Sequence, residues 1–126
     1  MKLSTLFTFN AVVAVLFALG FLLMPESVLA LYDVIADQTA IVMSRFFGGA
    51  VLGIGLLAWF AKNTEDSEAR KAIVLAFFLS NLVGIAVSIH GQLTGEANQL
   101  GWSTVAIYIL LAAGYGYFQF SKSKEA

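Results

Sequence analysis

The chain has no cysteine, a single proline and a single histidine among its 126 residues. Without cysteine there is no disulfide, no thiolate nucleophile and no thiolate metal site. Charged residues are also scarce, because Asp, Glu, Lys and Arg make up 12% of the chain, about half the share found in a soluble domain. The net charge of -1 and the lack of a basic stripe predict no attraction to nucleic acid.

Catalytic motifs are missing as well. No G-x-S-x-G turn or paired general base accompanies the serines and threonines, and no glycine-rich phosphate loop follows a strand. His90 ends an apolar run without partners at metal-ligand spacing. We therefore expect no catalytic residue, no metal site and no cofactor, and the protein is predicted not to be an enzyme.

Apolar residues dominate the chain, at 60% of the composition and a mean hydropathy of +0.85. They form four runs, and a helix needs about 20 such residues to cross the hydrocarbon core of a bilayer. The sequence predicts an all-α transmembrane four-helix bundle that makes residues 1–126 one integral membrane domain. The expected spans cover residues 3–24, 38–61, 72–91 and 100–120, with a charged hairpin at 62–71 and a polar tail at 121–126.

The first run permits a second interpretation. Lys2, the apolar residues 11–23 and the small residues near Ala30 also fit a cleavable signal peptide. We favour a retained span because the run is long enough to cross. After it, Pro25 suits the first turn of a helix, so a short amphipathic interfacial helix is expected to lead straight into the second span.

Basic residues predict the orientation. With four crossings, one side of the membrane holds Lys2, Lys62, Arg70, Lys71, Lys122 and Lys124. The positive-inside rule then places both termini and the central hairpin in the cytoplasm. Thr64 is the expected N-cap of the third span. Aromatic residues at the expected span ends are interpreted as interfacial girdles: Trp59, Tyr115 and Tyr117 inside, Tyr32 and Trp102 outside.

Arg45 is the costly residue, since it lies within a predicted span. It either reaches toward the interface, pairs with an aspartate such as Asp37, or binds an anionic group. If the second and third spans form an antiparallel hairpin, Arg45 lies at the depth of Ser88. The candidate ligand-binding residues are Arg45, Asn81, Ser88 and Tyr108, although hydrogen bonds between helices also explain such a polar layer.

Small residues indicate where helix backbones approach one another. Gly49 and Gly53 form a G-x-x-x-G pair on the second span, which we interpret as the central packing element. The candidate packing residues are Gly48, Gly49, Gly53, Gly55, Gly84, Ala112 and Gly116. The alternative is that these glycines let a ligand approach the backbone.

Several segments carry a family resemblance: Pro25 with residues 29–32, residues 45–48, residues 53–59, and the pair Gly101 and Trp102. With them the chain resembles small bacterial four-helix membrane proteins of uncharacterised function. That resemblance implies a multi-pass protein of the bacterial inner membrane and no activity. In size the chain is also similar to the small multidrug transporters, but its first span lacks their membrane-embedded glutamate, since the first acidic residue is Glu26.

Two functions follow from this sequence. The first is a non-enzymatic accessory or interaction subunit, whose partners are the lipid bilayer and either a second copy of the chain or a larger membrane complex. The alternative is an oligomeric binding or transport protein for a small anionic or amphiphilic ligand, held by the polar layer around Arg45.

Overall fold

The structure, a computed structural model, describes residues 1–121, and the expected polar tail lies outside them except for Ser121. Five helices follow one another: α1 (Leu3–Leu23), α2 (Pro25–Leu31), α3 (Gln38–Ala61), α4 (Glu68–Leu93) and α5 (Gly101–Phe120). Within the described residues there is no strand, so the all-α prediction is confirmed. Helices α1, α3, α4 and α5 are long and apolar enough to cross a membrane, as predicted.

Helix boundaries follow from local capping. Asp37 accepts a hydrogen bond of 2.8 Å from the amide of Ala40 and so begins α3. Ser67 accepts one of 3.2 Å from the amide of Arg70, so α4 begins four residues before the expected span. The expected N-cap at Thr64 is wrong, because its hydroxyl instead donates to the carbonyl of Ala61 at the end of α3, at 2.6 Å.

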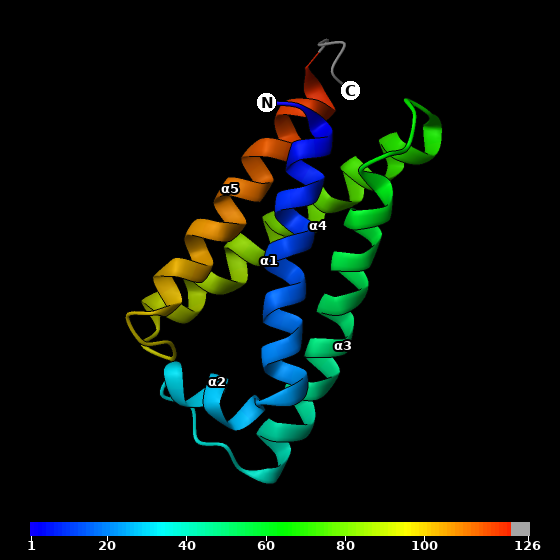
Figure 1. Cartoon of the computed structure of the whole chain (residues 1–126). Coiled ribbons are helices and arrows are strands. Elements are labelled where there is room, and N and C mark those ends of the chain that lie inside the picture. Colours follow the sequence, from blue (N-terminus) through cyan, green and yellow to red (C-terminus); the bar gives the residue numbers. More distant parts are fainter. Residues whose placement is uncertain (122–126) are drawn as a thin grey trace.

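The short helix after Pro25 is present, but it does not lead straight into α3. Asp33 adopts a left-handed backbone with φ of 60°, which short polar side chains tolerate better than most residues. The turn that follows α2 separates it from Asp37. Helix α2 is therefore a separate element at one end of the molecule (Figure 1).

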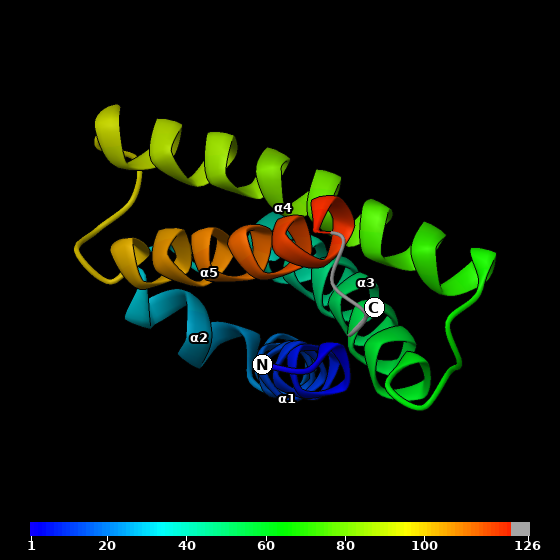
Figure 2. The ribbon, with the colours of Figure 1, turned by 90° about the horizontal axis from the view of Figure 1, so that it is seen from above.

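The four long helices associate as two pairs. Helix α3 packs along α1 and α4 packs along α5, whereas α3 and α4 share no comparable contact within residues 1–121. Figure 1 shows α3 and α4 leaving their connecting loop in different directions, and Figure 2 shows α5 between α4 and α1. The expected α3–α4 hairpin is thus not a packed pair.

Small residues allow the first pair to pack closely. A Cβ added to Gly48 would lie 3.0 Å from Phe21, and one added to Gly55 would lie 2.9 Å from Val15. Both glycines are buried, as is Ala58. In a bilayer, where lipid is as apolar as the helices, such close backbone approach is a main source of association.

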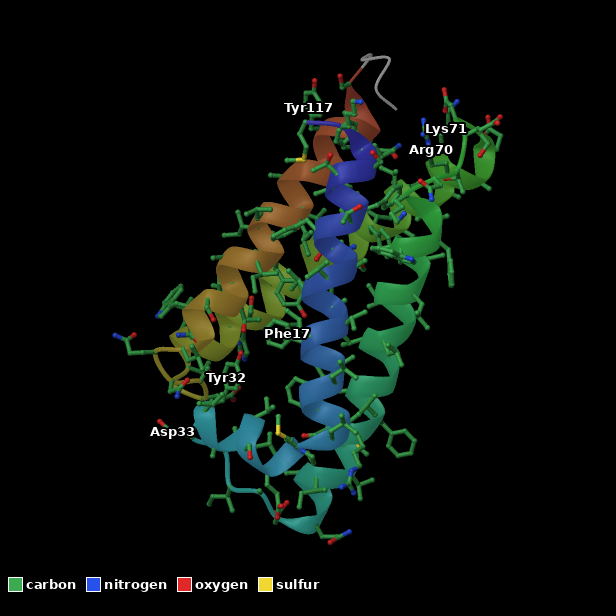
Figure 3. The ribbon with its side chains drawn as sticks, in the orientation of Figure 1. Phe17, Tyr32, Asp33, Arg70, Lys71 and Tyr117 are labelled. Atoms are coloured by element: carbon green, nitrogen blue, oxygen red, sulfur yellow. The ribbon has the colours of Figure 1, made fainter. Side chains whose placement is uncertain are left out.

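The bundle is packed solidly at one end, which we call the basic end. The start of α1, which follows Lys2, and the end of α3, which precedes Lys62, lie at this end (Figure 1), together with Arg70 and Lys71 (Figure 3). Beneath them the rings of Phe7, Phe77 and Tyr115 meet with centroids 5.1 to 6.2 Å apart. The core cluster joins α1, α3, α4 and α5 there.

Candidate functional site

The space between the two helix pairs forms a cavity of about 390 Å³, which we call the interhelical cavity. All four long helices line it, together with Leu29 and Tyr32 from α2 and the turn after it. This volume is more than twice that of an engineered cavity of roughly 150 Å³ that holds benzene. It also falls within the range of small-molecule sites, about 300 to 1,000 Å³.

The lining is mostly apolar and carries no charged side chain among the described residues. Along α1 it runs from Asn10 to Phe21, which at 1.5 Å per residue is about 16 Å. Phe17 lies between these residues, at mid-height in Figure 3. The six polar lining residues are Asn10, Tyr32, Ser80, Asn81, Thr104 and Tyr108. An elongated apolar space with a few neutral polar groups is suited to an uncharged molecule.

Two asparagines lie at the end of the cavity that borders the packed core. Asn10 is 4% exposed and Asn81 is 7% exposed. Asn10 donates from Nδ2 to the hydroxyl of Tyr115 at 2.8 Å, and Asn81 donates from Nδ2 to the carbonyl of Phe77 at 2.7 Å. Neither amide oxygen accepts a hydrogen bond from any residue between 1 and 121. Both side chains line the cavity, so these two oxygens are candidate ligand contacts.

The far end of the cavity is closed by Tyr32 and Thr104, whose hydroxyls lie 3.4 Å apart. Asn98, in the loop between α4 and α5, donates to the carbonyl of Leu31 at 2.9 Å and to the carboxylate of Asp33 at 3.2 Å. Figure 3 places Tyr32 and Asp33 together at this end. These bonds attach the loop to the end of α2, the segment that contributes Leu29 and Tyr32 to the lining.

A mouth is present on one side of the cavity. Of all its lining residues, only Phe47, Ile54 and Ser80 are exposed. Phe47 and Ile54 belong to α3 and Ser80 to α4, the two helices that do not pack together. The exposed part of the lining therefore belongs to α3 and α4.

The structure brings only some of the predicted ligand-binding residues together. Asn81 and Tyr108 line the cavity, and the Tyr108 ring packs against Gly84, where a Cβ would collide with it. Ser88 does not line it and donates to the carbonyl of Gly84 in its own helix, at 2.7 Å. Arg45 is exposed and, within residues 1–121, forms no ion pair or hydrogen bond. The expected layer of Arg45 with Ser88 is not assembled, because α3 packs on α1 instead of α4.

The predicted packing residues divide in the same way. Gly48 and Gly55 contact α1, Gly84 and Gly116 contact the rings of Tyr108 and Phe78, and Ala112 is buried. Gly49 and Gly53 meet no atom within 4 Å of an added Cβ. The G-x-x-x-G face of α3, formed by Gly49 and Gly53, is therefore uncovered within residues 1–121. Gly48 and Gly55, on the adjacent stripe, pack against α1 instead.

Sequence reasoning assigned two tyrosines to the wrong environment. Tyr115 was interpreted as an interfacial residue, but it is fully buried and bonded to Asn10. Tyr32, assigned to the same class, is half-buried and lines the cavity with Thr104. The available signal was Asn10, a polar residue within an apolar run, since an amide in a bilayer-length helix requires a partner.

Comparison with known families shows where the chain belongs. The model of a domain of unknown function (DUF8292) matches residues 8–123, which is most of the chain. The chain therefore belongs to this family, and the expected relation to an uncharacterised family is confirmed to that extent. No curated protein and no solved structure matches the chain.

Proposed function

We propose that this member of the DUF8292 family is a non-enzymatic membrane protein that binds a small, uncharged, mostly apolar molecule in the interhelical cavity. The observation that supports this proposal most directly is a cavity of about 390 Å³ whose lining within residues 1–121 carries no charge. Two buried asparagines line it, and each uses its amide nitrogen for a hydrogen bond within the protein. An anionic ligand is less suited to it, because Arg45 does not line the cavity.

The membrane setting of this proposal rests on α1, α3, α4 and α5 as spanning helices. The start of α1, the end of α3 and the start of α4 lie at one end (Figure 1), and these segments contain or adjoin Lys2, Lys62, Arg70 and Lys71. The acidic residues Glu26 in α2, Asp33 in the turn after it and Glu96 in the loop after α4 belong to the segments at the other end. By the positive-inside rule the basic end faces the cytoplasm, in a bacterial inner membrane. Both termini then lie on the cytoplasmic side, and α2 lies at the outer interface.

In this proposal the ligand enters from the lipid between α3 and α4, the helices that carry the exposed lining residues. An apolar molecule dissolved in the hydrocarbon would enter sideways past Phe47 and Ile54 without crossing a polar headgroup layer. This route favours molecules that already partition into the bilayer, and it distinguishes a lipid-phase binding protein from a channel with openings at both ends.

The test compares two substitutions that add the same ring. Val13→Phe places a phenyl group in the cavity, whereas Val83→Phe places it on a surface position that is 62% exposed. Small molecules that copurify in mild detergent are extracted and quantified per protein by mass spectrometry. A molecule present in wild type and in Val83→Phe but depleted in Val13→Phe is the expected result. Equal recovery in all three proteins would reject cavity binding.

The second candidate is the interaction subunit, and one observation favours it. Gly49 and Gly53 leave a flat strip on α3 that no other residue between 1 and 121 covers. A second copy of the chain packing there would give a homo-oligomer. Native mass spectrometry of wild type and of Gly53→Leu tests this candidate: a dimer lost in the variant supports it, and a monomer in both proteins rejects self-association through this face.

A further inference from the structure

The orientation of the Asn81 amide is fixed by its partner. A backbone carbonyl can only accept, so the bond of 2.7 Å to Phe77 requires the amide nitrogen of Asn81 on that side. The amide oxygen must then point elsewhere. Because Asn81 lines the cavity and its oxygen has no partner in residues 1–121, the cavity contains a fixed hydrogen-bond acceptor.

The neighbouring pair of Asn10 and Tyr115 is not fixed in this way. The hydroxyl of Tyr115 can donate as well as accept, so the amide of Asn10 can be turned over and keep its hydrogen bond. In one orientation Asn10 leaves its oxygen free, and in the other it leaves its nitrogen free. Asn10 therefore offers a ligand either an acceptor or a donor.

Core packing brings these two amides to one region. Phe77 accepts the bond from Asn81 one turn away, and its ring centroid lies 5.1 Å from that of Tyr115, which accepts the bond from Asn10. The fixed acceptor of Asn81 and the adaptable amide of Asn10 thus belong to the same end of the interhelical cavity. The remaining wall toward Tyr32 is mainly apolar.

We propose that this end of the cavity binds the hydroxyl group of a long-chain alcohol, whose apolar chain extends past Phe17 toward Tyr32 and Thr104. This inference rests on the proposed function and specifies its ligand. A hydroxyl both donates and accepts, so it satisfies the oxygen of Asn81 and the free group of Asn10 together. A ketone or an ether cannot donate to Asn81, and a carboxylate or an ammonium group would be buried without an opposite charge.

The probes are a decanol with a photoreactive diazirine in its chain and the methyl ether of the same molecule. The ether keeps the chain and the acceptor oxygen and lacks only the donor. Each probe is titrated into wild type, Asn81→Leu and Val83→Phe in detergent, with concentrations expressed as mole fraction in the micelle. After illumination, mass spectrometry locates and quantifies the labelled peptides. Helix content and melting temperature establish that each variant is folded.

In wild type and in Val83→Phe we expect the alcohol to label the lining of α1 and α5 at about one tenth of the ether concentration, a typical effect of one satisfied buried acceptor. In Asn81→Leu the two probes should label alike. A preference for the alcohol that persists in Asn81→Leu would overturn the role of Asn81. The comparison within wild type stands even if Asn81→Leu does not fold.

Failure of this inference is distinguishable from failure of the proposed function. Equal labelling of the cavity by both probes in wild type would reject the hydroxyl site and leave an apolar binding cavity. Labelling confined to lipid-facing residues would reject both. Competition by unlabelled decanol and by dioctanoylglycerol identifies the source of the hydroxyl, because a single-chain alcohol and a glycerolipid differ in the volume they need within about 390 Å³.

Discussion

The amide of Asn10 in α1 and the hydroxyl of Tyr115 in α5 form a buried hydrogen bond of 2.8 Å that joins residues 105 positions apart. Because α1 belongs to one helix pair and α5 to the other, the bond connects the two pairs at the border of the packed core and the cavity. The bond therefore marks the level along the bundle at which the packed core ends and the cavity begins.

Loss of this bond should weaken the bundle. Tyr115→Phe removes the hydroxyl and leaves Asn10 without a partner, which we expect to lower the free energy of unfolding by about 1 kcal/mol, as for other hydrogen bonds between membrane helices. Unfolding in mixed micelles with increasing SDS measures it. The matched control is Tyr117→Phe, since Tyr117 is 56% exposed and its change should be close to zero. Equal stability of both variants would contradict a structural role for the bond.

Gly53 and Gly55, two residues apart on α3, should respond differently to the same substitution. Gly55→Val forces side-chain atoms against Val15 and Ala14, so we expect a loss of about 1 to 3 kcal/mol from overpacking. Gly53→Val meets open space and should leave the stability of the monomer unchanged. The same SDS titration compares the two variants. A greater loss for Gly53→Val would mean that α3 packs through its other face.

Gly84 and Tyr108 should behave as a coupled pair. Gly84→Ala places a methyl group against the Tyr108 ring and is expected to destabilise the α4–α5 pair, whereas Tyr108→Ala makes room for it. A double-mutant cycle on unfolding free energies should give an interaction energy of about 0.5 to 3 kcal/mol. The double variant should lose less unfolding free energy than the sum of the losses in the two single variants. If the two losses of unfolding free energy simply add, the Tyr108 ring does not contact Gly84.

Asn98 should hold the loop between α4 and α5 against the end of α2. Asn98→Ala removes the bonds to Leu31 and Asp33, so residues 25–37 and 94–100 should exchange their amide hydrogens faster. Hydrogen exchange with mass spectrometry measures this, and Gln99→Ala, in the same loop, provides the control. Unchanged exchange in Asn98→Ala would show that other contacts hold these two segments together.

The sequence was sufficient to predict the all-α class and the four long apolar helices, because helix length and hydropathy depend on the local run alone. It did not predict which helices pair. In soluble helices an apolar stripe identifies the buried face, but α1 is apolar on nearly every side and offers no such stripe. The pairing of α3 with α1 follows from the fit of Gly48 and Gly55 to Phe21 and Val15, which sequence spacing does not reveal.

The candidate site was predicted in part for the same reason. Asn81 was recognised as a polar residue in an apolar run, and Tyr108 was added from its expected depth beside the third span; both line the cavity. Arg45 and Ser88 were added on the assumption that consecutive spans pack together, and the structure leaves them apart. Tyr32 and Tyr115 resemble interfacial residues in sequence, since an aromatic ring near a helix end has the same local context in either role.

The pairing of α1 with α3 and of α4 with α5 has a consequence for assembly. Each half of the chain already contains one complete helix pair, and residues 62–67 link the halves without packing α3 on α4. Two separately synthesised fragments, divided within that linker, would each insert as a unit and then recombine through Asn10, Tyr115 and the core around Phe77. The protein in this sense consists of two unlike helix pairs joined by one linker, and the interhelical cavity lies at the seam between them.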